Sequence, residues 1–198
     1  MTRPDCITVY RIGLYQVFEE TTSGNPNDSP LGMVATEIKE MISSYLADAT
    51  SFHTSHDIVN EYASLTYAHG WLDAARYLGF LEGNSIPLLL PDDDQIPLQQ
   101  HDRLIEKATR YERMLNEADK SVKVAPEIGS PLFQAAGKIK TIVKEIRDKI
   151  SSRQSNETYS AALGELSYGY GWLDAGVRAG LFRICGNPHL FTTETEEP

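Results

Sequence analysis

The chain has 198 residues, of which 41% are hydrophobic and 23% are charged, a composition typical of a soluble globular protein. No apolar run reaches the length of a membrane span, and the N-terminus lacks the pattern of a signal peptide. The two cysteines, Cys6 and Cys185, are too few and too far apart for a disulfide framework or a zinc-type spacing. We therefore expect a cytoplasmic protein that does not associate with a membrane.

The formal net charge of −10 is unevenly distributed along the chain. Residues 1–98 contain four basic and fourteen acidic side chains, whereas residues 99–198 contain fourteen of each. Since an acidic surface repels phosphate groups, this balance argues against bulk nucleic-acid binding by the first half.

Three helices are predicted for residues 1–82. The first is the weakest, and its apolar positions are Ile7, Leu14, Val17 and Phe18. The second helix begins with Ser29 as N-cap and Pro30 at the first helical position, and apolar residues then recur at intervals of three and four. The third is expected to open after the polar pair Thr54 and Ser55 and to run as far as Phe80 and Leu81.

Residues 83–100, GNSIPLLLPDDDQIPLQQ, are predicted to be a linker, because their prolines break helices. The acidic triplet Asp92, Asp93 and Asp94 is interpreted as a solvated charge run. A calcium loop would need further oxygen ligands and a turn glycine at defined spacing, and these are missing.

Residues 101–184 are predicted to form three more helices, followed by an acidic tail at residues 185–198. Ser130 and Pro131 repeat the helix start seen in the first half. The third helix is expected to open after Ser155 and Asn156. The third helix is expected to run through Gly-Trp-Leu-Asp-Ala to Leu181 and Phe182. The first helix of this half is expected from its apolar positions: Leu104, Ala108, Tyr111, Leu115, Ala118, Val122.

The two halves share a gapless register with an offset of 101 residues. YAHGWLDA at 67–74 aligns with YGYGWLDA at 168–175, and in the same register Ser-Pro-Leu at 29–31 aligns with Ser-Pro-Leu at 130–132. We interpret this register as a tandem duplication. The predicted fold class is therefore all-α, with two tandem three-helix bundles that are related by the duplication and pack on each other.

The segments TYAHGWLDAARYLGFL and SYGYGWLDAGVRAGLF resemble the end of the archaeal Domain of Unknown Function 357 family. That family is similar in having a small helical bundle that ends in a Tyr-Ala-x-Gly-Trp-Leu-Asp-Ala-Gly-x-Arg-x-Gly-type helix. The second repeat follows this pattern at Gly176, Arg178 and Gly180, whereas the first has Ala75 for the glycine and an early arginine at Arg76. The resemblance implies an archaeal origin and brings no activity, substrate or catalytic residue.

The repeated motif supplies our candidate binding residues: Gly70, Trp71, Asp73, Gly171, Trp172, Asp174 and Arg178. One interpretation is structural, with tryptophans in the core, glycines at a close helix contact, and ion pairs from Asp73 to Arg76 and from Asp174 to Arg178. The other interpretation is a partly exposed patch that binds a partner or a small ligand.

A basic helix face in the second repeat is the other candidate surface. Lys140, Lys144 and Arg147 lie at i, i+4 and i+7, so they share one face of the helix. Three interpretations stay open: a solvated face, a surface that attracts an acidic repeat or a second chain, and a site for a phosphate-bearing ligand. The last would be the only route to nucleic acid that we expect.

Two further patterns of histidine and arginine occur in the sequence. His53, His56 and His69 are close in sequence, but the second repeat has Gln154, Glu157 and Tyr170 there, so we predict no metal site. Arg183 and His189 have an Arg-x5-His spacing similar to that of helical nucleases of the HEPN class.

The sequence therefore favours a non-enzymatic interaction or scaffold module that binds a protein partner or itself. We assign no catalytic residue and expect no cofactor. The alternative is a HEPN-like RNA-processing or nucleotide-directed enzyme.

Overall fold

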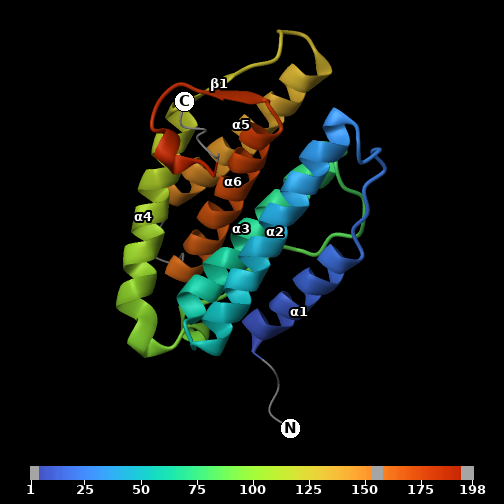
Figure 1. The fold of residues 1–198 in the computed structure, drawn as a ribbon. Coiled ribbons are helices and arrows are strands. Elements are labelled where there is room, and N and C mark those ends of the chain that lie inside the picture. The colour runs from blue at the N-terminus through green and yellow to red at the C-terminus, as the bar shows by residue number, and fades with distance from the viewer. Residues whose placement is uncertain (1–4, 153–157, 193–198) are drawn as a thin grey trace.

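The computed structural model describes residues 5–152 and 158–192, and within these ranges it is mostly helical (Figure 1). The first repeat contains α1 (Cys6–Glu19), α2 (Pro30–Thr54) and α3 (Ile58–Tyr77), and the second contains α4 (His101–Lys120), α5 (Pro131–Ser151) and α6 (Tyr159–Arg178). Short elements complete the described chain: the 3-10 turns η1 (Asp93–Gln95), η2 (Leu98–Gln100) and η3 (Pro188–Leu190), and the strands β1 (Val122–Val124) and β2 (Phe182–Ile184). The prediction of three helices per repeat is confirmed.

The starts of α2 and α5 follow the predicted pattern. The hydroxyl of Ser29 accepts a hydrogen bond from the backbone N–H of Gly32 at 3.0 Å, and that of Ser130 accepts one from Phe133 at 3.1 Å. A proline follows each cap, where its missing N–H costs no intrahelical bond. In both helices, the serine that precedes the first turn therefore accepts a hydrogen bond from one of its free N–H groups.

The predicted N-cap of α3, the third helix of the first repeat, was wrong. Thr54 is the last residue of α2 and Ser55 is its C-cap, while Asp57 caps α3. Thr158, the equivalent of Asp57 at an offset of 101, caps α6. The predicted caps of the second repeat, Ser155 and Asn156, lie outside the described residues.

The C-terminal ends of α3 and α6 also differ from the prediction. These helices stop at Tyr77 and Arg178 because Gly79 and Gly180 adopt positive φ angles of 77° and 73°, a left-handed conformation that ends a helix. Phe80 and Leu81 therefore follow α3 rather than end it, and Leu181 and Phe182 likewise follow α6.

In each repeat a short strand pairing, which the sequence pattern did not predict, joins the segment after the first helix to the segment after the third helix. In the second repeat β1 and β2 are antiparallel, with Lys123 opposite Arg183. The first repeat forms the equivalent bridge between Thr22 and Glu82. Val122 therefore belongs to β1, and α4 ends two residues before it.

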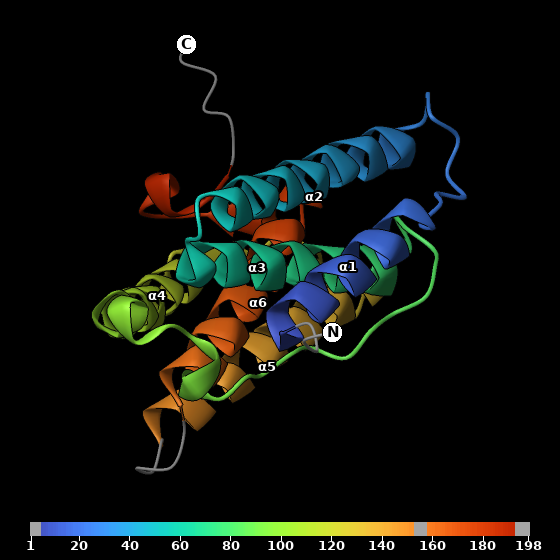
Figure 2. The ribbon, with the colours of Figure 1, turned by 90° about the horizontal axis from the view of Figure 1, so that it is seen from below.

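The two repeats share one continuous hydrophobic core. Helices α3 and α6 lie side by side at the centre, and α1 and α4 lie on opposite sides of this pair (Figures 1 and 2). The largest fully buried side chains come from both repeats: Trp71, Tyr62, Leu14, Ile38, Ile42, Leu46, Leu65, Leu72, Leu81, Ile96, Leu104, Leu115. The expectation that the two bundles pack on each other is confirmed.

Residues 83–100 connect the repeats and pack on them. Tyr62 donates a hydrogen bond to the backbone carbonyl of Leu89 at 2.6 Å, and Ile96 is buried in the core. Asp93 accepts hydrogen bonds from the backbone N–H groups of Tyr159 and Ser160 at the start of α6. One aspartate of the acidic triplet thus supports a helix N-terminus.

Candidate functional site

The repeated Gly-Trp-Leu-Asp motif lies where α3 crosses α6, a contact that we call the inter-repeat seam. A Cβ atom added to Gly70 would lie 2.1 Å from the carbonyl oxygen of Tyr168, and one added to Gly171 would lie 2.4 Å from that of Tyr67. Because Tyr67 and Tyr168 are equivalent residues of the two repeats, the contact is reciprocal. Glycine is required at both positions because the opposing atoms are backbone, which cannot rotate away.

Tyrosine and aspartate side chains also exchange hydrogen bonds across the seam. The hydroxyl of Tyr168 on α6 donates to Asp73 Oδ2 on α3 at 2.8 Å. In the opposite direction, the hydroxyl of Tyr67 on α3 donates to Asp174 Oδ2 on α6. The motif aspartates therefore each bind a tyrosine of the other repeat.

The two motif tryptophans are core residues. Trp71 is fully buried, and only 6% of Trp172 is exposed. The ring of Trp172 packs against Tyr77 of the first repeat, with centroids 5.8 Å apart. The tryptophans therefore stabilise the seam and present no surface patch.

Asp73 is surrounded by cationic and hydrogen-bonding groups. Its Oδ1 accepts a hydrogen bond from the guanidinium of Arg76 at 3.0 Å, and its Oδ2 lies 3.3 Å from Nε2 of the buried His69. The other ring nitrogen of His69, Nδ1, shares a hydrogen bond with the hydroxyl of Tyr10 at 2.7 Å. Burial raises the pKa of Asp73, but His69, Tyr168 and Arg76 outweigh this and hold that pKa below its usual value.

Asp174, the equivalent of Asp73, has very different surroundings. It is 2% exposed and accepts hydrogen bonds from Tyr67 and from the hydroxyl of Thr192 at 3.0 Å. Within residues 5–152 and 158–192 it forms no ion pair with a basic side chain. Burial raises the pKa of Asp174 to about 6, because these neutral donors only partly replace water.

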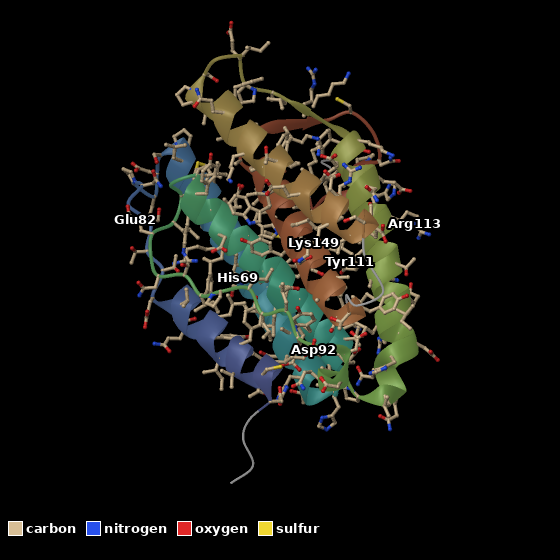
Figure 3. All side chains as sticks on the ribbon, turned by 180° about the vertical axis from the view of Figure 1, so that it is seen from behind. His69, Glu82, Asp92, Tyr111, Arg113 and Lys149 are labelled. Atoms are coloured by element: carbon tan, nitrogen blue, oxygen red, sulfur yellow. The ribbon has the colours of Figure 1, made fainter. Side chains whose placement is uncertain are left out.

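A cavity of about 220 Å³ lies beside Asp174. It is lined by side chains from α2, α3, α4 and α6 and by the turn after β2, and tyrosine is the commonest residue among them: Tyr45, Tyr67, Tyr111, Tyr170. Figure 3 labels Tyr111 on α4, which lines this cavity, and His69 on α3, which lies beside Asp73. Asp174 is thus almost fully buried and reaches open space through this cavity, whereas the side chain of Asp73 is 21% exposed.

The predicted ion pair between Asp174 and Arg178 is absent. Arg178 Nε instead lies 2.9 Å from Glu37 Oε2 on α2 of the other repeat. The carboxylate of Asp174 is buried and accepts hydrogen bonds from the hydroxyls of Tyr67 and Thr192. The predicted pair between Asp73 and Arg76 is present.

The basic face of α5 is partly neutralised within its own repeat. Lys140 donates to Oδ1 of Asp119 at 2.7 Å and to its backbone carbonyl at 2.6 Å, and Arg147 donates to Asp119 Oδ2. Lys144 is exposed and pairs with Asp148 on the same helix. Lys39, the equivalent of Lys140, donates to the carbonyl of Thr21, so both lysines bind near the end of the first helix of their repeat.

The remaining sequence candidates do not converge. His53 contacts Glu61 at 3.1 Å, whereas His69 binds Tyr10 and lies beside Asp73. Arg183 is exposed on β2, while His189 follows in η3 and lines the Asp174 cavity. No group of three or more metal-binding side chains is found in the described part of the chain.

Sequence reasoning missed most of the cavity. Tyr45, Tyr170 and Thr192 were not proposed as functional residues, since each comes from a different element and is unremarkable in its own helix or turn. The repeat register contained one signal, because Tyr111 aligns with Tyr10. Tyr10 shares a hydrogen bond with His69, the neighbour of Asp73, and Tyr111 lines the cavity beside Asp174.

Comparison with known proteins gives one match. The family model described as "Protein of unknown function (DUF357)" matches residues 10–81 and again residues 110–182, so each repeat corresponds to one copy of the family domain. No curated protein and no solved structure matches the chain. No helix among the described residues has the length and apolar character needed to cross a bilayer.

Proposed function

The chain belongs to the DUF357 family and carries two copies of its domain, and from this premise we propose that it is a cytoplasmic, non-enzymatic interaction or scaffold protein. The proposal depends on the observation that the residues of the repeated motif contact the other repeat. The glycines, tryptophans and aspartates of the motif are engaged in the inter-repeat seam, where they hold two bundles together as one body. A motif whose polar atoms serve packing is typical of a structural role.

The seam resembles the interface of a two-fold dimer made permanent by covalent linkage. Gly70 contacts Tyr168 as Gly171 contacts Tyr67, and the tyrosine–aspartate bonds are exchanged in the same way. The outer helices are then free to diverge, as the charges of the two repeats have done. This arrangement supports the binding of a protein partner by different outer faces of one rigid unit.

The HEPN-like alternative has one observation in its favour, because His189 and Asp174 line the same cavity. Arg183, the other residue of the Arg-x5-His spacing, is not among the lining residues and is exposed on β2. The alternative therefore lacks the convergence of arginine and histidine that its chemistry needs.

The test has two arms and uses the full chain. In the first, the tagged protein is recovered from its natural host, each co-purifying protein is made separately, and binding is measured by light scattering with the purified pair. We expect a stoichiometric complex or a defined homo-oligomer; a chain that stays monomeric and binds none of these proteins contradicts the proposal.

In the second arm, the wild type, Arg183→Ala and His189→Ala are incubated with a mixed RNA substrate. We expect no cleavage by any of the three proteins. Cleavage by the wild type that both substitutions abolish would establish the enzyme alternative instead.

A further inference from the structure

The duplication provides an internal comparison of two equivalent carboxylates. Asp73 lies beside the guanidinium of Arg76 and the ring of His69. At an offset of 101 residues, the equivalents of these two partners are Val177 and Tyr170. The second repeat therefore keeps the buried carboxylate and replaces its cation with an apolar and an aromatic side chain.

The space beside Asp174 is surrounded by aromatic rings. Ring centroids are 4.4 Å apart between Tyr45 and Tyr67, 6.2 Å between Tyr67 and Tyr170, and 6.5 Å between Tyr170 and Tyr111. The four rings thus form a continuous arc contributed by four helices, and the cavity of about 220 Å³ lies against it. An arc of electron-rich rings next to a carboxylate is a surrounding that attracts a cation.

We propose that this pocket binds a small organic cation that carries an alkylated ammonium group, with Asp174 as its counter-ion and the four tyrosine rings as its cage. The proposal goes beyond the interaction role, since it concerns a small ligand and a different part of the molecule from the outer faces. In the first repeat the chain's own Arg76 provides the cation; in the second repeat the ligand provides it.

The available acceptors favour an alkylated ammonium over a primary one. Asp174 Oδ2 already accepts hydrogen bonds from Tyr67 and Thr192, and Oδ1 has a single long contact of 3.4 Å with the backbone N–H of Thr192. A primary ammonium has three N–H donors that need partners when buried, whereas a quaternary group has none. The cavity is smaller than the 300–1,000 Å³ or so of sites for drug-sized ligands, which fits a compact head group.

The charged groups near the rings have both signs. Arg110 on α4 acts on Tyr111 as a positive charge, but it does not line the cavity. Asp48 on α2 and Glu117 on α4 act on Tyr45 and Tyr170 and add negative potential. The amino group of Lys107 lies 5.3 Å from the ring centroid of Tyr111 but does not line the cavity. His189 in η3 does line it and is the one basic side chain among the lining residues that the structure describes.

The proposal is tested by calorimetric titration of the full chain with choline chloride and with 3,3-dimethylbutan-1-ol, a neutral molecule of the same shape, at matched ionic strength. We expect choline to bind and the neutral molecule to bind at least about tenfold more weakly, a difference of about 1.4 kcal/mol. Equal binding of the two, or no binding of choline, would overturn the proposal.

Two variants with the same loss of charge localise the site. Asp174→Asn keeps the shape and the acceptor for Tyr67, and it is expected to weaken choline binding at least about tenfold. Asp28→Asn, at an exposed turn position that does not line the cavity, removes the same charge and is expected to leave binding unchanged. Equal binding by Asp174→Asn and the wild type, or an equal loss in both variants, contradicts the assignment.

The pH dependence gives an independent readout. Choline affinity is expected to fall between about pH 7.5 and about pH 5, as Asp174 is protonated. Tyr45, Tyr67, Tyr111 and Tyr170 stay neutral over this range, because burial raises the pKa of each. His189→Gln should keep the fall in affinity; if this substitution abolishes it, Asp174 is not the counter-ion.

Discussion

The hydroxyl of Tyr168 lies 2.8 Å from Oδ2 of Asp73 across the inter-repeat seam, and the equivalent bond from Tyr67 to Asp174 runs in the opposite direction. This reciprocity means that each repeat completes the hydrogen bonding of the other's buried aspartate. Neither three-helix bundle has these bonds alone, so the two repeats are expected to unfold together.

Alanine at the seam glycines should be strongly destabilising. Gly70→Ala and Gly171→Ala each place a methyl group against a backbone carbonyl oxygen, at 2.1 Å and 2.4 Å, and we expect each to cost at least about 3 kcal/mol of unfolding free energy. Gly137→Ala is the matched control in α5, where a Cβ meets nothing within 4 Å, and it should be stabilising by up to about 1 kcal/mol. Urea denaturation followed by circular dichroism measures all three; similar effects at the three positions would refute the close contact.

The two motif aspartates should respond oppositely to neutralisation. The pKa of Asp73 is lowered in the fold, so its charge stabilises the protein above its usual pKa, and this contribution is lost as the pH falls. Asp73→Asn should therefore lower the unfolding free energy by about 1–3 kcal/mol near neutral pH, because hydrogen bonds to a charged group are lost.

For Asp174 the sign reverses, because its pKa is raised from 3.8 to about 6. Its folding contribution is fully present below the unfolded pKa and is lost as the pH rises through 6. Asp174→Asn should be more stable than the wild type by about 1–3 kcal/mol at about pH 7.5, and the difference should disappear at about pH 4. Denaturant titrations at both pH values decide this; a loss of stability equal to that of Asp73→Asn at neutral pH would show that Asp174 is not an unpaired buried carboxylate.

Removal of a seam tryptophan should damage the whole protein. Trp172→Ala deletes a ring that is 6% exposed and contacts Tyr77 of the other repeat, so we expect a loss of about 3–5 kcal/mol or unfolding. Leu98→Ala, at a position that is 79% exposed, should change the unfolding free energy by less than about 0.5 kcal/mol. If the Trp172→Ala protein unfolds cooperatively at the wild-type midpoint, Trp172 does not contribute to the stability of the core.

The basic residues of α5 should differ in how much they contribute to the unfolding free energy. Lys140 binds both the side chain and the backbone of Asp119, so Lys140→Ala should cost about 1–2 kcal/mol. Lys144 is exposed, with a single partner one turn away, and Lys144→Ala should cost less than about 0.5 kcal/mol. Equal effects in thermal unfolding would instead indicate a uniformly solvated face.

Local signals in the sequence were enough to predict the helical repeats. The intervals of three and four between apolar residues, and the Ser-Pro starts at Ser29 and Ser130, depend on neighbours within one or two turns of helix. The 101-residue register then predicted the duplication, and the shared glycines Gly70 and Gly171 predicted a close helix contact. The helices and their starts could be predicted because they depend on residues close together in the chain, and the duplication could be predicted because aligning the chain with itself needs no structure.

The partners of buried polar groups were decided by the tertiary structure. Asp174 and Arg178 are four residues apart, yet they do not pair, because the packing of α6 on the first repeat directs one to Tyr67 and the other to Glu37. The tyrosine cavity likewise draws its rings from four helices. Which side chains meet depends on how helices far apart in the sequence cross, and the periodicity of each helix alone carries no information about that crossing.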